Sequence, residues 1–119
     1  MKVQVRNAPK ATIIDCTGDV DLYSSPNLRE ALLKEVRAGG SDVLVNMTGV
    51  SYIDSSGIAT LVEGLQLSQR TKTRFGLFGL RNNARSVLEL ARLNRVFPIF
   101  ENEQEALEKI AATQPFSGL

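Results

Sequence analysis

The sequence contains no histidine, no tryptophan and only one cysteine, Cys16. Without histidine, the Ser-His and Cys-His pairs of many hydrolases and histidine-based metal sites are excluded. A lone cysteine can form neither an internal disulfide nor a thiolate cluster, which is typical of proteins from a reducing compartment. We therefore expect a cytoplasmic protein that holds no metal and no cofactor.

Long apolar segments are missing as well. No hydrophobic run approaches the roughly 20 residues that a membrane-spanning helix needs, and the first residues lack the apolar stretch of a signal peptide. The formal net charge is only +1, which provides no general attraction for nucleic acid or for anionic membranes. These absences predict no membrane insertion and no direct binding of nucleic acid.

The remaining composition is that of one ordinary globular domain. The chain has 119 residues, of which 43% are hydrophobic and 23% are charged, so it can bury a core without disulfides. We expect a single domain over residues 1–119, with an ordered core over about 2–112. The tail over 114–119 is expected to be frayed.

Hydrophobic periodicity predicts strands that alternate with helices. Apolar residues in alternation or in short runs indicate strands over 2–6, 12–17, 43–47, 74–78 and 96–100. Apolar residues at helical spacing indicate helices over 26–38, 56–70, 83–91 and 103–111. The first two strands are close enough to form an antiparallel hairpin, whereas the later alternation predicts parallel pairing. The expected fold class is α/β, with a mixed, mostly parallel sheet of four to five strands packed against about four helices.

Some residues are predicted to mark the ends of these elements. Ser25 precedes Pro26 and is expected to cap the first helix, and either Asn82 or Asn83 is expected to cap the third. The segment Asn102–Glu105 has the spacing of a capping box at the start of the last helix. Pro98 cannot donate a backbone hydrogen bond, so the last strand is expected at an edge of the sheet.

The segment Thr48–Ile58, between a buried strand and an amphipathic helix, is the most unusual part of the chain. Its Asp54-Ser55-Ser56-Gly57 places a carboxylate and two hydroxyls at a helix start, where the dipole and free N–H groups favour an anion. Capping of the helix is the simplest local interpretation. A hydrolase elbow and a phosphate-binding loop are both missing, so Ser55 is better placed to receive a group than to deliver one. Tyr52 fits either a core position or a flank of this site.

These residues resemble the signature of STAS domains of the anti-sigma factor antagonist family. Asp54-Ser55-Ser56-Gly57 follows a buried strand, as it does in that family. Gly18-Asp19-Val20-Asp21 is similar to the family's second motif, and Asn102–Leu107 is similar to the start of its last helix. The resemblance covers about residues 2–112, and the three stretches in the right order make it specific.

The resemblance implies a protein that changes partners when it is phosphorylated. The first serine of the motif is the phosphorylation site, which corresponds to Ser55, and Ser56 is the second candidate. The unphosphorylated antagonist binds an anti-sigma factor that is itself a serine kinase, and so releases a sigma factor; a PP2C-type phosphatase resets the switch. The chain itself is then not an enzyme, and its expected partner-binding residues are Asp21, Asp54, Ser55, Ser56 and Gly57.

The sequence departs from the family pattern at Ile58-Ala59, where Leu-Gly is common, and at Asp19-Val20, where Glu-Leu is common. Both changes keep the character of the residues and bear on which partner is recognised. Two other functions stay open. One is a STAS accessory subunit of a membrane transporter, such as a lipid-asymmetry ABC system, because stand-alone STAS proteins of this kind and antagonists have similar sequences. A small hydrolase that uses Ser55 would show esterase or phosphoesterase activity that Ser55→Ala removes.

Overall fold

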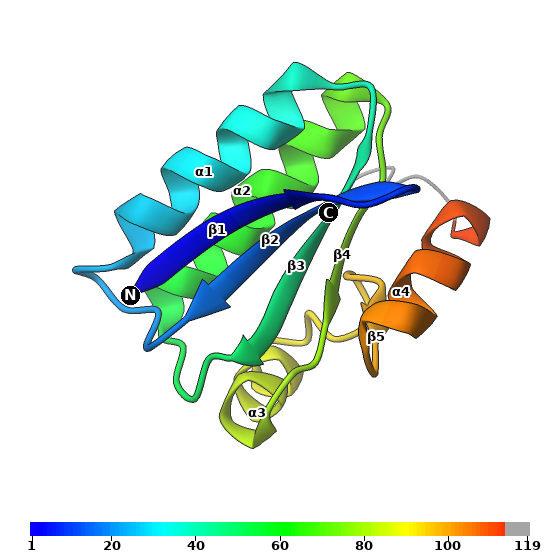
Figure 1. Cartoon of the computed structure of the whole chain (residues 1–119). Coiled ribbons are helices and arrows are strands. Elements are labelled where there is room, and N and C mark those ends of the chain that lie inside the picture. The colour runs from blue at the N-terminus through cyan, green and yellow to red at the C-terminus, as the bar shows by residue number, and fades with distance from the viewer. Residues whose placement is uncertain (114–119) are drawn as a thin grey trace.

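The strands of the computed structural model, which describes residues 1–113, form one sheet in the order β1-β2-β3-β4-β5 (Figure 1). β1 pairs with β2 in antiparallel fashion, and the other neighbouring strands are parallel. The predicted hairpin and the mixed, mostly parallel sheet are therefore confirmed, whereas the tail over 114–119 lies outside the described residues. The strands are β1 (Lys2–Asn7), β2 (Ala11–Thr17), β3 (Asp42–Gly49), β4 (Phe75–Phe78) and β5 (Ile99–Phe100).

Helices cover both faces of the sheet (Figure 1). Within residues 1–113 they are α1 (Ser25–Ala38), α2 (Ser55–Thr71), α3 (Asn82–Leu90) and α4 (Glu103–Lys109), with a 3-10 turn over Ile110–Ala112. α1 and α2 lie side by side on one face, α4 lies on the other, and α3 lies beyond the carboxyl ends of the strands. Because the sheet is wound in one direction, its right-handed crossovers place α1 and α2 on the same face. None of the helices described has the length and apolar character that would let it cross a membrane.

Each face of the sheet has its own apolar core. Successive side chains of a strand point to opposite faces, so Ile13 and Ile14 of β2 belong to different cores. Under α4 lies the smaller cluster of Ala11, Ile13, Leu44, Phe78, Phe100, Ala106 and Ile110. Under α1 and α2, the fully buried large side chains include Ile14, Leu28, Leu32, Met47, Leu61, Leu65 and Phe75.

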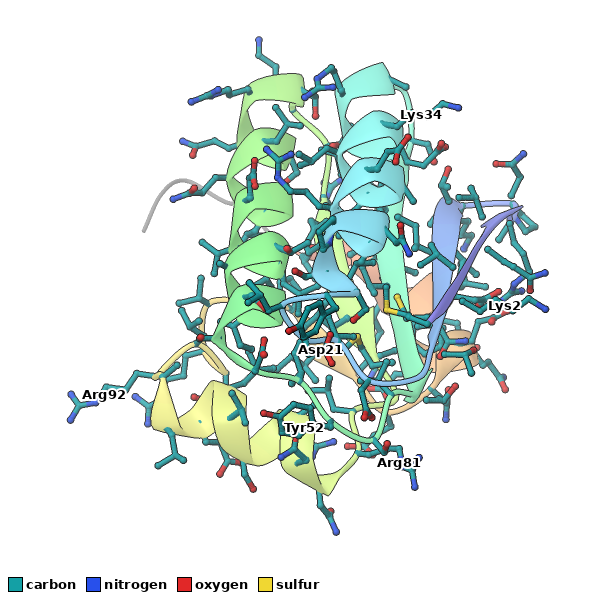
Figure 2. The ribbon with its side chains drawn as sticks, turned by 90° about the vertical axis from the view of Figure 1, so that its left-hand side faces the viewer. Lys2, Asp21, Lys34, Tyr52, Arg81 and Arg92 are labelled. Carbon is teal, nitrogen blue, oxygen red and sulfur yellow. The ribbon has the colours of Figure 1, made fainter. Side chains whose placement is uncertain are left out.

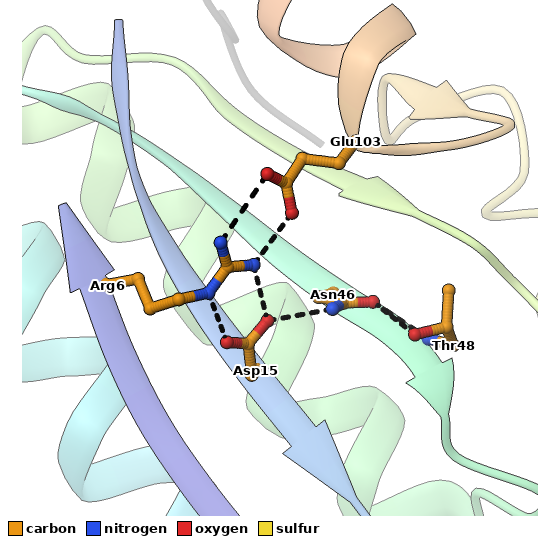
Figure 3. Close-up of polar contacts among 5 residues, drawn as sticks. All are labelled: Arg6, Asp15, Asn46, Thr48 and Glu103. Carbon is orange, nitrogen blue, oxygen red and sulfur yellow. Dashed lines mark hydrogen bonds and ion pairs between the residues drawn. The ribbon is translucent and has the colours of Figure 1, made fainter. Parts of the chain in front are cut away.

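A polar network continues the α4 face of the sheet beyond its apolar cluster (Figure 3). Arg6 of β1 donates from Nη2 to Asp15 of β2 at 2.9 Å and to Glu103 of α4 at 2.7 Å. Asn46 of β3 donates to Asp15 at 2.7 Å and accepts from the Thr48 hydroxyl at 2.7 Å. The Arg6 guanidinium holds the pKa of the Asp15 carboxyl below its ordinary value. The network fastens the first strand to the last helix across a separation of 97 residues.

Two predicted helix starts are wrong. α1 begins at Ser25 with Ser24 at the N-cap, because the Asp21 carbonyl oxygen already accepts the Ser25 N–H at 2.8 Å. The pair Asn82-Asn83 lies inside α3, whose N-cap residue is Arg81 and makes no side-chain capping bond. Both helices therefore begin one or two residues earlier than the predicted capping residues indicated.

The last strand is also shorter than predicted. The strand expected over 96–100 contains only Ile99–Phe100, because the N–H groups of Val96 and Phe97 bond to the Leu93 carbonyl oxygen in turns. β5 does lie at an edge of the sheet, as Pro98 indicated.

The capping box at the start of α4 is only partly formed. The Asn102 side chain accepts from the Glu105 N–H at 2.9 Å, as predicted. The Glu105 carboxylate, however, accepts from the Glu101 N–H at 3.0 Å. The reciprocal bond therefore reaches one residue further back than a capping box requires.

Candidate functional site

The first turn of α2 is capped by the carboxylate of Asp54. Its Oδ1 accepts from the backbone N–H groups of Ser56 at 2.9 Å and Gly57 at 3.2 Å, and from the Ser56 hydroxyl at 2.6 Å. The Ser56 hydroxyl, with the backbone N–H groups of Gly57, Ser56 and Leu22, holds the pKa of Asp54 below its ordinary value. The capping interpretation is confirmed, and the site contains a carboxylate that is ionised at neutral pH.

The two serines of the motif have different surroundings. Ser55 is exposed at the first position of α2, and its hydroxyl has no hydrogen-bond partner among residues 1–113. Ser56 is half-buried, and its hydroxyl donates a hydrogen bond to Oδ1 of Asp54. The free N–H groups expected at this helix end are reduced, because Asp54 already accepts from two of them. A hydroxyl that receives a phosphate must be accessible, and Ser55 meets this condition better than Ser56.

Gly57 is buried, and its lack of a side chain allows the first turn of α2 to pack closely against Val20 and Ile53. A Cβ atom at this position would lie 2.5 Å from Cγ1 of Ile53 and 2.7 Å from Cγ1 of Val20. Both neighbours are buried, so neither could move away freely. Gly57 therefore supports the site by close packing and does not share the exposed surface of Ser55.

The two sequence motifs meet at an isolated parallel bridge between Val20 and Ile53. The Val20 N–H donates to the Tyr52 carbonyl oxygen at 2.9 Å, and the Asp54 N–H donates to the Val20 carbonyl oxygen at 3.1 Å. The Ile53 N–H donates to the Asn83 side chain at 2.9 Å, which attaches α3 to the same loop. The predicted neighbourhood of the two motifs is thus held by backbone hydrogen bonds. The role of Asn83 was not predicted, because a side chain that reaches across 30 residues leaves no local signal.

Asp21 is half-buried and organises the turn before α1. Its Oδ1 accepts from the N–H groups of Tyr23 and Ser24, both at 3.0 Å, and from the Ser24 hydroxyl at 3.1 Å. Asp19, in the same loop, accepts from the Ser51 hydroxyl at 3.1 Å. None of the basic residues in the described part of the chain forms an ion pair with Asp19, Asp21 or Asp54. The site is therefore a locally negative surface in a nearly neutral protein.

The loops that carry these carboxylates also carry exposed apolar side chains. Leu22 is 69% exposed, Tyr23 is 90% exposed and Tyr52 is 44% exposed. We call these three residues the apolar patch. Figure 2 shows Tyr52 at the same end of the molecule as Asp21, with Arg81, the N-cap residue of α3, nearby. Tyr52 flanks the site, whereas Leu22 and Tyr23 were missed, although two large apolar residues in a turn are a signal that sequence reasoning can use.

Metal chemistry finds no support in the described residues. Among residues 1–113, no three or more side chains of the metal-binding types gather in a group that could hold an ion. The arrangement combines an exposed hydroxyl, negative charge and the apolar patch, which suits contact with another protein.

A model of the STAS domain matches residues 2–106, so the chain belongs to the STAS domain family. It is 28% identical over 88 residues to an anti-sigma-B factor antagonist of Listeria monocytogenes, with 74% of this chain and 77% of that protein covered. Its fold is similar to that of an anti-sigma factor antagonist from Mycobacterium paratuberculosis, with a TM-score of 0.85 and 18% identity over 92% and 93% of the two chains.

The fold is also similar to that of the anti-sigma factor antagonist SpoIIAA. Its unphosphorylated form gives a TM-score of 0.73 at 16% identity, with 94% of this chain and 100% of that chain covered. The phosphorylated Bacillus form gives 0.71 at 18% identity, with 92% and 99% covered. The solved structures show the fold, and together with the sequence relatives they confirm the resemblance to anti-sigma factor antagonists.

Proposed function

We propose that this protein is an anti-sigma factor antagonist that is switched by phosphorylation of Ser55. The unphosphorylated chain binds an anti-sigma factor that is also a serine kinase, and this binding releases a sigma factor for transcription. A PP2C-type phosphatase removes the phosphate and restores binding. The observation that carries the proposal is the exposed, unbonded hydroxyl of Ser55 at the start of α2, in a STAS domain with antagonist relatives. The protein acts in the cytoplasm and catalyses no reaction itself.

The surface around Ser55 supplies a physical reason for partner binding. The apolar patch offers surface that is exposed in the isolated chain and can be buried by a partner, with aromatic groups that often anchor interfaces. Asp21 and Asp54 lie beside it and give the partner a negative surface to match. A partner with a basic rim around an apolar recess would fit this combination.

Phosphorylation would act on this surface and leave the fold intact. Ser55 is exposed and its hydroxyl makes no bond that the phosphate would break. A phosphate adds roughly 1.5 to 2 negative charges. The new charge would lie next to Asp54, where no basic side chain in the described chain forms a neutralising ion pair. Like charges at an interface cost several kcal/mol, and about 2.7 kcal/mol is enough to weaken binding a hundredfold.

The proposal is tested by incubating the chain with ATP and each candidate anti-sigma factor kinase from its own organism. Mass spectrometry should locate one phosphate on Ser55. Ser56→Ala should still be phosphorylated, and Ser55→Ala should not. Phosphate on another residue, or on none, would contradict the assignment of Ser55.

Binding to the same kinase is then measured by calorimetry. Ser55→Asp should fold normally and bind at least about a hundredfold more weakly than the wild type, whereas Ser55→Ala should bind as well as the wild type. Tyr23→Ser should weaken binding about tenfold without a change in melting temperature, because its side chain is 90% exposed. If Ser55→Asp binds as tightly as the wild type, the electrostatic switch is wrong. Binding to a transporter ATPase that is insensitive to Ser55→Asp would favour the transporter role.

A further inference from the structure

The outer edge of β1 is the longest unpaired backbone edge of the sheet. β1 is first in the strand order, and among residues 1–113 it pairs with β2 alone. Val5 of this strand is 44% exposed, and Met1, directly before the strand, is 37% exposed. Met1, Val3 and Val5 form one wall of a groove of about 420 Å³, and the other wall consists of Asn27, Glu30, Ala31, Lys34 and Glu35 of α1.

This edge lacks one of the protections that exposed edge strands often have, a charge on its apolar side. Inward-pointing charges often prevent an edge from pairing with another chain. The two cations of β1 are Lys2 and Arg6, and they alternate with the valines, so they point to the opposite face of the sheet. Arg6 is moreover held by Asp15 and Glu103. No charged side chain of β1 therefore lies on the apolar side of its edge.

We propose that two copies of this chain pair through this edge, with β1 antiparallel to β1 of the second copy. A two-fold axis at Val3 places Val3 opposite itself, Met1 opposite Val5, and Lys2 opposite Gln4. All the apolar side chains of the edge then meet on the α1 side of a continuous sheet of ten strands. A two-fold interface needs a surface that complements itself, and this strand meets that condition.

Charge selects both the second copy and the register. A two-fold axis at Gln4 would keep the valines together but place Lys2 opposite Arg6, and like charges directly across a strand pair are destabilising. The axis at Val3 avoids this repulsion. The rim of the groove carries Glu30 and Glu35 on both sides of Lys34, so two symmetry-related rims can pair opposite charges. The groove shares no residue with the Ser55 site, so the dimer presents two such sites.

Disulfide trapping tests the register. Val3 lies directly opposite Cys16 in the β1–β2 pair, so the cysteine variants are made in a Cys16→Ala background to prevent an internal bridge. Facing Cβ atoms in an antiparallel pair are about 4.5–5.5 Å apart, close to the spacing that a disulfide requires. Val3→Cys should therefore form a covalent dimer under mild oxidation. Val5→Cys should do so at least tenfold less, because Val5 faces Met1 of the second copy. Equal yields, or no dimer from Val3→Cys, would overturn the register.

Sedimentation equilibrium tests the dimer itself. The wild type should dimerise, and Val5→Lys should raise the dissociation constant about a hundredfold or more, because the two-fold axis brings both added charges into the interface. Leu90→Lys is the matched control, since Leu90 is 85% exposed on α3 and lies outside the groove. A wild-type chain that stays monomeric up to about 1 mM would overturn the proposal, and so would equal effects of the two lysine substitutions.

Discussion

The two loops at the carboxyl end of the sheet use the same device to different effect. Each is organised by one aspartate, Asp21 in the loop before α1 and Asp54 in the loop before α2. In the first loop the Ser24 hydroxyl bonds to Asp19 and Asp21, and the residues that project are apolar. In the second loop the projecting residue is Ser55, whose hydroxyl is unbonded within the described chain. One loop is built for contact, and the other exposes a group that can be modified.

The largest expected effect on stability comes from disrupting the packing at the Val20–Ile53 bridge, which connects the two loops. Gly57→Val should lower the free energy of unfolding by about 1–3 kcal/mol, because its side chain would collide with Val20 and Ile53 at the bridge. Ala59→Val, at an exposed position of the same helix, should cost no more than about 0.7 kcal/mol. Urea denaturation measures both. Equal stability of the two variants would show that the Val20–Ile53 bridge tolerates a side chain at Gly57.

A smaller effect should separate the serines of the two loops. Ser24→Ala removes a hydroxyl that bonds to Asp19 and Asp21 and should cost about 1 kcal/mol of unfolding free energy. Ser55→Ala removes an exposed, unbonded hydroxyl and should change stability by no more than about 0.5 kcal/mol. Thermal melting of both variants under identical conditions checks the difference. The comparison between the loops fails if Ser55→Ala is the more damaging change.

The smallest effect concerns the titration of Asp54. Its pKa is lowered in the folded chain, first by the Ser56 hydroxyl and then by backbone N–H groups. Such a group stabilises the fold at pH values above its ordinary pKa of about 3.9, and this stabilisation is lost as the pH falls through the lowered pKa. Ser56→Ala should therefore raise the pKa of Asp54 toward its ordinary value, so that the acid-induced loss of stability becomes smaller and is complete at a higher pH. NMR titration of the carboxyl carbon measures the shift, and Ser55→Ala should leave it unchanged.

Much of the fold could be predicted because its elements have clear periodicity. The alternation around Val3 and Val5 indicates a strand with one exposed face. The apolar run of β3 indicates a strand that is covered on both faces, and the helical spacing in α2 indicates one buried helix face. The D-S-S-G motif and the turn that contains Asp21 were placed at one partner surface by the resemblance to STAS domains. These inferences depend on local periodicity and on a family signature, and both are present in the sequence.

The features that were missed depend on contacts between distant residues. The burial of Gly57 follows from the positions of Val20 and Ile53, and neither position can be read from the motif itself. The exposure of Leu22 and Tyr23 runs against the usual preference of large apolar residues for the core. The network around Arg6 joins three strands and a helix, and no local sequence pattern predicts it.

The strand order has a consequence for how the protein is made. Every strand after β1 pairs with the strand that was synthesised just before it. The sheet can therefore grow one strand at a time as the chain leaves the ribosome, because each strand from β3 onward pairs with its predecessor after a single helical crossover. The contact between Arg6 and Glu103 must wait until α4 has emerged. The ion pair between the first strand and the last helix therefore forms only after all five strands have been synthesised.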